Sequence, residues 1–312
     1  MILYFAPLEG ITGYIYRNAY EKYYGHIDKY FAPFMSPADN CAMNPKERKD
    51  VLPENNVGIT LVPQILTCKS KHFIDAVQEL QTMGYTEVNL NLGCPSGTVC
   101  AKGKGAGFLP ETDKLHAFLE EIYSFGNVNN VAISIKTRLG YYDAEEFTDL
   151  LSIFNEYPIK ELIIHPRIRN DYYKGEPRLT FYKYAMEHSK NPLVYNGNVF
   201  DESDFASISA QLENKPRHVM LGRGLISNPE LATKLNGVIR ENLFDYKRFF
   251  EFHDCIYQSY KEIMSPDIHV LYRMKELWTY WKTLFPGCER DIKHVLKAKK
   301  YVEYESALRQ LK

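Results

Sequence analysis

The sequence predicts an α/β fold, a (β/α)8 TIM barrel followed by a C-terminal helical bundle. Short apolar runs rich in β-branched and aromatic residues recur along most of the chain, and amphipathic stretches separate them. Strands that alternate with helices in this way are typical of the barrel, although strand counting leaves a doubly wound open sheet as an alternative. The eight expected strands are 2–6, 29–32, 58–64, 87–92, 131–137, 161–165, 193–196 and 218–221.

The segments between these strands show helical periodicity. Residues 71–83 place Phe73, Val77 and Leu80 on one face, and residues 112–125 and 144–154 repeat the pattern. Pro229 is suited to the first turn of a further helix. No run after residue 242 has the pattern of a strand. We therefore expect two domains, a catalytic barrel over residues 1–242 and a helical domain over residues 243–312.

The C-terminal segment interleaves aromatic and basic residues. It contains both tryptophans and has 13 Lys and Arg against 10 Asp and Glu, in a chain whose net charge of −1 does not by itself indicate a nucleic-acid partner. Leu277, Trp281 and Leu284 share a helical face, which fits a core as well as a binding surface. The candidates for contact with nucleic-acid phosphates are Arg273, Lys275 and Lys282.

The composition is that of a globular protein. With 312 residues and 45% hydrophobic residues the chain can build a sizeable core, and no stretch is suited to span a membrane. The N-terminus is typical of a first strand rather than a signal peptide, and the six cysteines show neither CxxC pairing nor a His partner at zinc spacing. We expect a cytoplasmic monomer with no metal and no membrane partner.

Polar residues and glycine turns follow seven of the expected strands. Active sites of (β/α)8 barrels lie at the C-terminal ends of the strands, so these residues are expected to converge on one rim. They are Pro7, Leu8, Glu9, Gln64, Asn91, Lys136, Arg138, His165, Arg167, Asn196, Gly197, Asn198, Gly222 and Arg223.

Two of these strand ends predict a phosphate site. The sequences Asn-Gly-Asn at 196–198 and Gly-Arg-Gly at 222–224 bring backbone N–H groups and a guanidinium to the part of a barrel that commonly binds phosphate. Each glycine could also merely turn the chain. A phosphate together with Gln64 and Lys136 suggests flavin mononucleotide (FMN), with Gln64 at the edge of the isoalloxazine and Lys136 near N1 and O2.

The stretch 87–107 runs from a strand into a loop with two cysteines and several glycines. Cys94 stands beside the strand end and is suited to packing as a small apolar residue. Cys100 lies among Lys102, Lys104 and glycines, so an exposed thiol in positive surroundings is expected. The sequence Gly-Lys-Gly-Ala-Gly at 103–107 matches neither the GxGxxG fingerprint nor a P-loop.

Asn-Leu-Gly-Cys-Pro at 91–95, the cysteine at 100 and Gly-Ala-Gly at 105–107 resemble the signature of the tRNA-dihydrouridine synthases, flavoenzymes that reduce uracil rings in tRNA. Ala-Pro-Leu-Glu-Gly-Ile-Thr at 6–12, Lys-Thr-Arg at 136–138 and His-Pro-Arg at 165–167 occur in the order of the family. The resemblance covers nearly the whole chain. It implies bound FMN, a tRNA substrate and a nicotinamide dinucleotide, NADPH or NADH, as reductant.

The resemblance also implies roles for single residues, with Cys100 as the catalytic general acid. The residues expected to bind FMN are Pro7, Leu8, Glu9, Gln64, Lys136, His165, Asn196, Gly197, Asn198, Gly222 and Arg223. The residues expected to contact the uracil or the tRNA are Asn91, Arg138, Arg167, Tyr173, Arg273, Lys275 and Lys282. The chain departs from the family where Ile168 replaces the usual Thr and where the usual glycine after Gln64 is absent, which leaves the uracil entrance and the tRNA position open.

Reduction of the uracil C5=C6 bond needs a hydride at C6 and a proton at C5. The resemblance implies that reduced flavin supplies the hydride and that Cys100 supplies the proton from the opposite face. An unperturbed thiol, with a pKa of ~8.5, is mostly protonated at neutral pH and suits this role. The alternatives are a small-molecule flavin barrel of the dihydroorotate or enoate reductase type and a tRNA-binding module without redox turnover.

Overall fold

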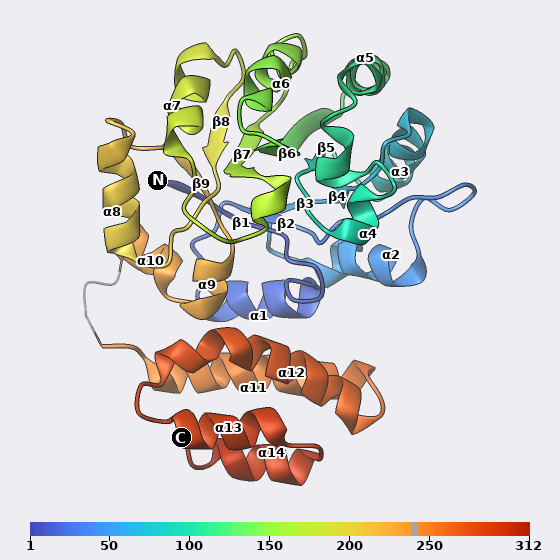
Figure 1. Ribbon diagram of the computed structural model, residues 1–312. Helices are drawn as coiled ribbons and strands as arrows, with labels where there is room; N and C mark the ends of the chain where they lie inside the picture. The colour runs from blue at the N-terminus through green and yellow to red at the C-terminus, as the bar shows by residue number, and fades with distance from the viewer. Residues whose placement is uncertain (239–242) are drawn as a thin grey trace.

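The computed structural model describes residues 1–238 and 243–312, which form a barrel with a helical bundle beside it (Figure 1). One sheet of nine parallel strands has the order β3-β2-β1-β9-β8-β7-β6-β5-β4. Only Pro63 separates β3 from β4, so the two ends of the sheet belong to one stretch of chain and the barrel is nearly closed. The strands are β1 (Ile2–Phe5), β2 (Lys29–Phe31), β3 (Leu61–Val62), β4 (Gln64–Ile65), β5 (Glu87–Leu92), β6 (Ala132–Gly140), β7 (Leu162–Ile168), β8 (Leu193–Tyr195) and β9 (His218–Leu221).

This arrangement confirms the predicted barrel and excludes the open sheet. Seven expected strands appear close to their predicted bounds, and β6 and β7 run further, to Gly140 and Ile168. The strand predicted over residues 58–64 is divided in two at Pro63, which has no N–H to donate to a ladder. As a result β3 pairs with β2, and β4 pairs with β5.

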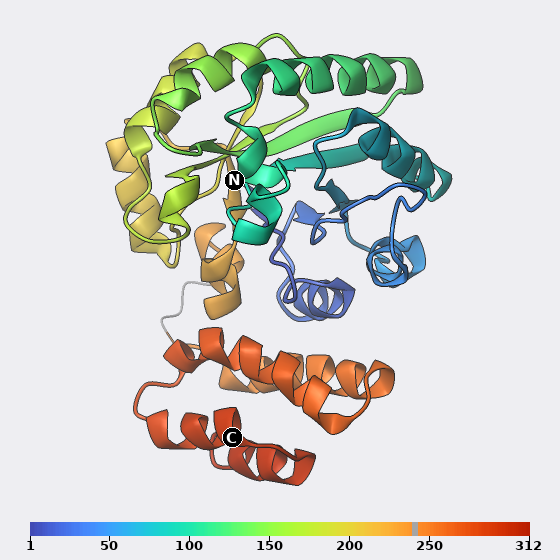
Figure 2. The same cartoon turned by 45° about the vertical axis from the view of Figure 1, so that its right-hand side comes forward.

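Helices surround the barrel, and in the orientation of Figure 2 the barrel lies above the bundle. The helices predicted over 71–83, 112–125 and 144–154 are confirmed as α3, α5 and α6, and the helix expected at Pro229 begins slightly later, as α10. The helices of the barrel are α1 (Tyr14–Tyr23), α2 (Pro45–Val51), α3 (Ser70–Thr82), α4 (Gly97–Cys100), α5 (Thr112–Asn129), α6 (Glu146–Phe154), α7 (Leu179–His188), α8 (Glu202–Gln211), α9 (Arg223–Ser227) and α10 (Leu231–Leu235). Short 3-10 turns add η1 (Pro53–Asn55), η2 (Gly105–Phe108) and η3 (Arg169–Asp171).

The inside of the barrel is filled differently at its two ends. An apolar cluster that includes Phe31, Ile163 and Met220 fills the middle. At the N-terminal ends of the strands, the Lys29 ammonium bridges the carboxylates of Glu87 and Glu161 at 2.9 and 3.1 Å. These charged groups occupy the N-terminal end of the barrel interior.

The C-terminal bundle packs against α1. It consists of α11 (Tyr246–Ile263), α12 (Asp267–Trp281), η4 (Lys282–Leu284), α13 (Glu289–Lys297) and α14 (Tyr301–Leu308), with no strand among the described residues after 242. Phe252 of α11 lies edge-on against Tyr16 of α1 and Tyr24 just after α1, at 5.5 and 5.3 Å between ring centroids. Leu277 and Trp281 are buried, so their helical face is part of the core. The predicted division after residue 242 borders residues 239–242, which lie outside the described part of the chain.

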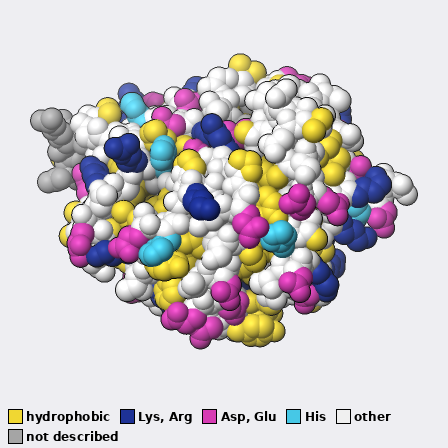
Figure 3. Space-filling model, turned by 90° about the horizontal axis from the view of Figure 1, so that it is seen from above, with side chains coloured by type: hydrophobic (Ala, Val, Ile, Leu, Met, Phe, Trp, Pro, Cys, Tyr) yellow, Lys and Arg dark blue, Asp and Glu magenta, His cyan; other side chains and the backbone are white. Residues whose placement is uncertain are grey.

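The barrel face turned away from the bundle carries Lys and Arg interspersed with Asp and Glu, without a patch of one sign (Figure 3). No helix in the described ranges is both long and apolar enough to cross a bilayer. Residues 1–238 and 243–312 also contain no cluster of His, Cys, Asp and Glu that could hold a metal ion.

Candidate active site

A cavity of about 370 Å³ opens at the C-terminal ends of the strands. The strand ends around it and α12 build its walls together. The predicted site residues in the walls are Pro7, Leu8, Glu9, Gln64, Asn91, Lys136, Arg138, His165, Tyr173, Asn196, Gly197, Gly222 and Arg223. Those outside the walls are Cys100, Arg167, Asn198, Arg273, Lys275 and Lys282.

The walls also include residues that the sequence analysis did not assign to a site. Phe34 follows β2, and the strand-end rule applied to that strand would identify it. Cys94, expected to pack, lines the cavity. Glu276 and Tyr280 lie one turn apart on α12, and no local signal marks them because α12 meets the barrel mouth only in the folded chain.

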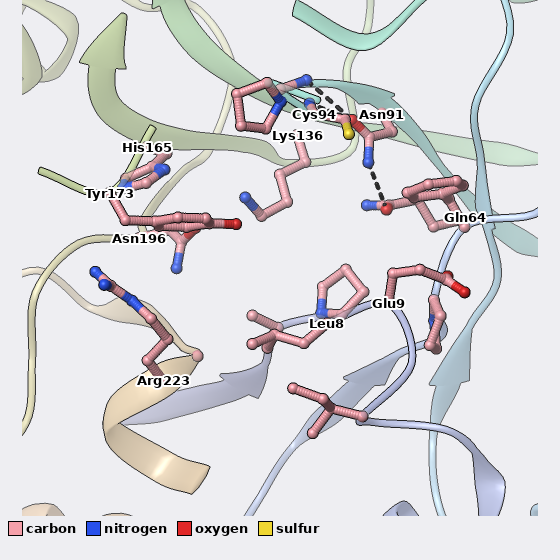
Figure 4. Close-up of a pocket in the computed structure, with 18 of the residues that line it drawn as sticks. Leu8, Glu9, Gln64, Asn91, Cys94, Lys136, His165, Tyr173, Asn196 and Arg223 are labelled. Carbon is pink, nitrogen blue, oxygen red and sulfur yellow. Dashed lines mark hydrogen bonds between the residues drawn. The ribbon is translucent and has the colours of Figure 1, made fainter. Parts of the chain in front are cut away.

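A chain of amide side chains connects the barrel interior to the loop after β5. Asn89 Nδ2 donates to Ser134 Oγ (2.9 Å), Gln64 Nε2 donates to Asn89 Oδ1 (2.7 Å), and Asn91 Nδ2 donates to Gln64 Oε1 (2.8 Å). Asn91 Oδ1 then accepts from the first two backbone N–H groups of the loop, at 3.0 and 2.9 Å (Figure 4). All four side chains are buried, and each bond fixes the orientation of the next amide. The start of the loop is thereby held from inside the barrel.

The loop after β5 places its two cysteines in different surroundings. Cys94 is half-buried in the cavity wall, and burial raises the pKa of its thiol, which keeps it protonated at neutral pH. Cys100 is only 8% exposed, and its thiol donates to the Cys94 carbonyl at 3.4 Å. The expectation of an exposed Cys100 is therefore wrong. The turn of α4 folds this residue back on Gly107, where a Cβ would lie 2.5 Å from the Cys100 carbonyl oxygen, so glycine permits the closure.

Basic side chains surround the cavity without carboxylate partners. Within the described residues no Asp or Glu forms a salt bridge with Lys136, Arg138, Arg167 or Arg223. Burial, reinforced by the charge of Arg138, lowers the pKa of Lys136 to about 7. Burial likewise lowers the pKa of Arg138 to about 10. An anion bound here would relieve this repulsion.

His165 is a neutral member of this group. Burial and the surrounding cations hold its pKa well below the usual range. Arg167 Nη1 lies 2.9 Å from His165 Nε2, and because a guanidinium can only donate, Nε2 accepts and the ring proton lies on Nδ1. Arg167, although outside the walls, therefore sets the tautomer of a residue that lines the cavity.

Tyr173 lies between two arginines at the cavity mouth. Its ring centroid is 5.6 Å from the guanidinium carbon of Arg138 and 4.6 Å from that of Arg223. Figure 4 shows Tyr173 and Arg223 on the side of the cavity opposite Gln64. Lys136 extends into the space between these two sides. Arg223 also donates to Asn198 Oδ1 at 3.1 Å, so Asn198 orients Arg223 from outside the walls.

The three basic residues predicted in the tail differ in their contacts. Arg273 donates to the Gly10 carbonyl at 2.7 Å and lies 3.5 Å from Glu276. Lys275 donates to the Ala298 carbonyl within the bundle. Lys282 is exposed. Two of the three are thus engaged in holding the protein together.

We expect Asn91→Ala to loosen the loop after β5, because it leaves the Gln64 carbonyl oxygen and two backbone N–H groups without partners. The cost should be about 1–3 kcal/mol, and hydrogen exchange at residues 93–94 should accelerate by about tenfold or more. Hydrogen exchange with mass spectrometry measures this. Asn129→Ala, which removes an exposed amide, is the control. Unchanged exchange in Asn91→Ala would show that the loop holds itself.

The model of the family described as "Dihydrouridine synthase (Dus)" matches residues 4–309. A "Probable tRNA-dihydrouridine synthase" of Staphylococcus epidermidis is 28% identical over 233 residues, and one of Staphylococcus aureus (strain Mu50) is 28% identical over 231 residues; each alignment covers 72% of this chain and 68% of the relative. A "Probable tRNA-dihydrouridine synthase 1" of Synechocystis is 23% identical over 232 residues, which cover 74% of this chain and 63% of the relative.

Proposed function

This chain belongs to the dihydrouridine synthase family, and on that premise we propose that it reduces the C5=C6 bond of specific uridines in tRNA, with FMN as cofactor and NADPH or NADH as reductant. The observation that carries the proposal is the cavity at the barrel mouth. A protonated thiol, a buried amide chain and cations without carboxylate partners meet there, in walls to which both the barrel and the bundle contribute.

The residues around the cavity fit FMN, which carries a phosphate dianion and a ring that becomes negatively charged on reduction. Arg223 and the backbone of the glycine turns at 197 and 222 would hold the phosphate. Position 197 accepts only glycine, because a Cβ there would lie 2.1 Å from the Tyr195 hydroxyl. Gln64 keeps one donor and one lone pair for the ring edge. Lys136 would lie beside N1 and O2. Once reduced, the bound flavin supplies the hydride.

A uracil that enters the cavity meets Asn91, Cys94, Arg138 and Tyr173 in the walls. The base must leave its stack in the tRNA to reach them. Lys282 is free to contact the tRNA backbone, whereas Arg273 and Lys275 would have to exchange their present partners to do so.

The loop after β5 offers two thiols as proton donor. The resemblance assigns this role to Cys100, and that assignment stays a prediction. The geometry favours Cys94, because its side chain lines the cavity and burial keeps its thiol protonated, whereas the Cys100 thiol is bonded to the Cys94 carbonyl. Donation breaks the S–H bond and forms the C5–H bond. The charges of Arg138 and Lys136 then stabilise the thiolate until solvent returns a proton.

The direct test supplies the purified protein with NADPH or NADH and tRNA from cells that lack this gene. The protein should be yellow, and dihydrouridine should appear in the tRNA, as measured by mass spectrometry. Flavin-dependent turnover of dihydroorotate or an enoate without dihydrouridine would identify a small-molecule reductase. A colourless protein that binds tRNA would be a binding module.

We expect Cys94→Ala to slow oxidation of the pre-reduced flavin by unmodified tRNA by roughly 10² to 10⁴, the range for loss of a positioned general acid. Flavin content and reduction by the nicotinamide should not change. Cys100→Ala should slow this single turnover less than about tenfold and lower thermal stability, because its thiol is buried. The opposite pattern would establish Cys100 as the donor.

We also expect FMN affinity to depend on pH through Lys136. Its ammonium is charged below its pKa of about 7, and the negative ring of reduced FMN would raise that pKa. Binding of reduced FMN therefore takes up a proton above pH 7, so its affinity is full below pH 7 and falls by up to about tenfold per pH unit above it. Fluorescence titration of the apoprotein measures this, and Lys136→Met is the control. If both proteins show the same pH dependence, Lys136 does not sense the cofactor.

A further inference from the structure

The loop after β7 carries a second aromatic residue next to Tyr173. Tyr172 is 42% exposed, and the guanidinium carbon of Arg169 lies 5.1 Å from its ring centroid and 5.3 Å from that of Tyr141. Tyr141, Arg169 and Tyr172 form a stack that we call the rim cluster. It lies outside the cavity walls, and the function proposed so far gives Tyr141 and Tyr172 no part.

Tyr172 is held in a costly backbone conformation. Its φ of 51° and ψ of −98° belong to a region that glycine usually occupies, as in the first central position of type II′ turns. Two contacts keep it there. The Tyr172 carbonyl accepts from Arg138 Nη2 at 2.6 Å, and the Tyr172 N–H donates to the Arg169 carbonyl at 3.2 Å. A large side chain retained where glycine would be relaxed points to a function of that side chain.

The conformation places two neighbouring tyrosines on different surfaces. Tyr173 lines the cavity, whereas Tyr172 contacts Arg169 outside it. Arg138 joins the two, because its guanidinium contacts the Tyr173 ring and the Tyr172 carbonyl. In Figure 1 this loop crosses the front of the barrel between β7 and α7. The exposed ring of Tyr172 therefore belongs to the residue next in the chain to one that lines the cavity.

Arg169 has no carboxylate partner among the described residues, and a hydrogen bond with the Cys100 side chain is the main cause of its raised pKa. In the described part of the chain it forms no salt bridge. It donates to Asn170 Oδ1 at 3.0 Å. The nearby Asp171 is already engaged, because it accepts from the Ile168 N–H at 2.9 Å and pairs with Arg178. The charge next to the rim cluster is therefore net positive, as an RNA backbone requires.

We propose that Tyr172 and Arg169 of the rim cluster stack and anchor the nucleotide that flanks the target uridine in tRNA. The inference rests on the proposed function. Unpaired bases in RNA are recognised by stacking on aromatic rings and guanidinium planes, and a flanking base that stacks outside the cavity holds the flipped uridine inside it. The site binds an unpaired nucleobase and its phosphate, and it does not contact the reacting atoms of the uridine.

Tyr172→Gly separates this role from a structural one, because it removes the ring and relaxes the backbone. The melting temperature should stay or rise, while the affinity for an unmodified transcript of a substrate tRNA should fall by roughly 5- to 150-fold, the range for loss of one stacked base. Tyr172→Phe, which keeps the ring, should bind like the parent. Arg169→Gln should weaken binding and reduce its salt slope by about one.

Transcripts with an abasic site on either side of the target uridine locate the stacked base. With one of them, Tyr172→Gly and the parent should bind equally. A lower melting temperature of Tyr172→Gly, parental affinity, or a loss that persists with both abasic transcripts would overturn the inference. A parent that forms no dihydrouridine refutes the proposed function instead, whereas a parent that forms it together with an unaffected Tyr172→Gly refutes only this inference.

Discussion

The hydrogen-bonded amides inside the barrel are the constraint on which the candidate site depends. Barrel interiors are usually packed with branched apolar side chains, and a polar layer is stable there only when each buried group has a partner. Strand register provides the partners, because Gln64 of β4 lies opposite Asn89 of β5, which lies opposite Ser134 of β6. Asn91 extends the chain into the loop, so the pairing of three strands determines where Cys94 stands.

The basic side chains around the cavity differ from these amides, because among the described residues they have no carboxylate partners to compensate their charge. Lys136 and the neighbouring arginines repel one another in a buried setting, which costs stability in the protein without a ligand. A bound anion turns the same charges into attraction. The site is therefore built to gain stability on binding, whereas the Lys29 ammonium at the other end of the barrel already has Glu87 and Glu161 as carboxylate partners.

Much of this could be predicted from the sequence, because strands and their polar ends are local patterns. Lys136, His165 and Asn196 were found by that rule, and they line one cavity. The burial of Cys100 could not be found in this way, because a Gly- and Lys-rich loop looks exposed until its turn folds back on Gly107. Tyr280 was missed for another reason, since its place in the wall depends on how α12 packs, and helical periodicity says nothing about that.

The hydrogen bond from Arg273 to the Gly10 carbonyl bears on how this protein can be divided. Gly10 belongs to the same short segment as Leu8 and Glu9, which line the cavity, and its φ of 81° brings the chain close to Arg273. The attachment of the bundle and the wall of the cavity thus share a few residues of backbone. A fragment that ended before the bundle would lack the part of the cavity wall that Glu276 and Tyr280 of α12 provide. The barrel and the bundle therefore build the candidate site together, and neither part contains the whole of it.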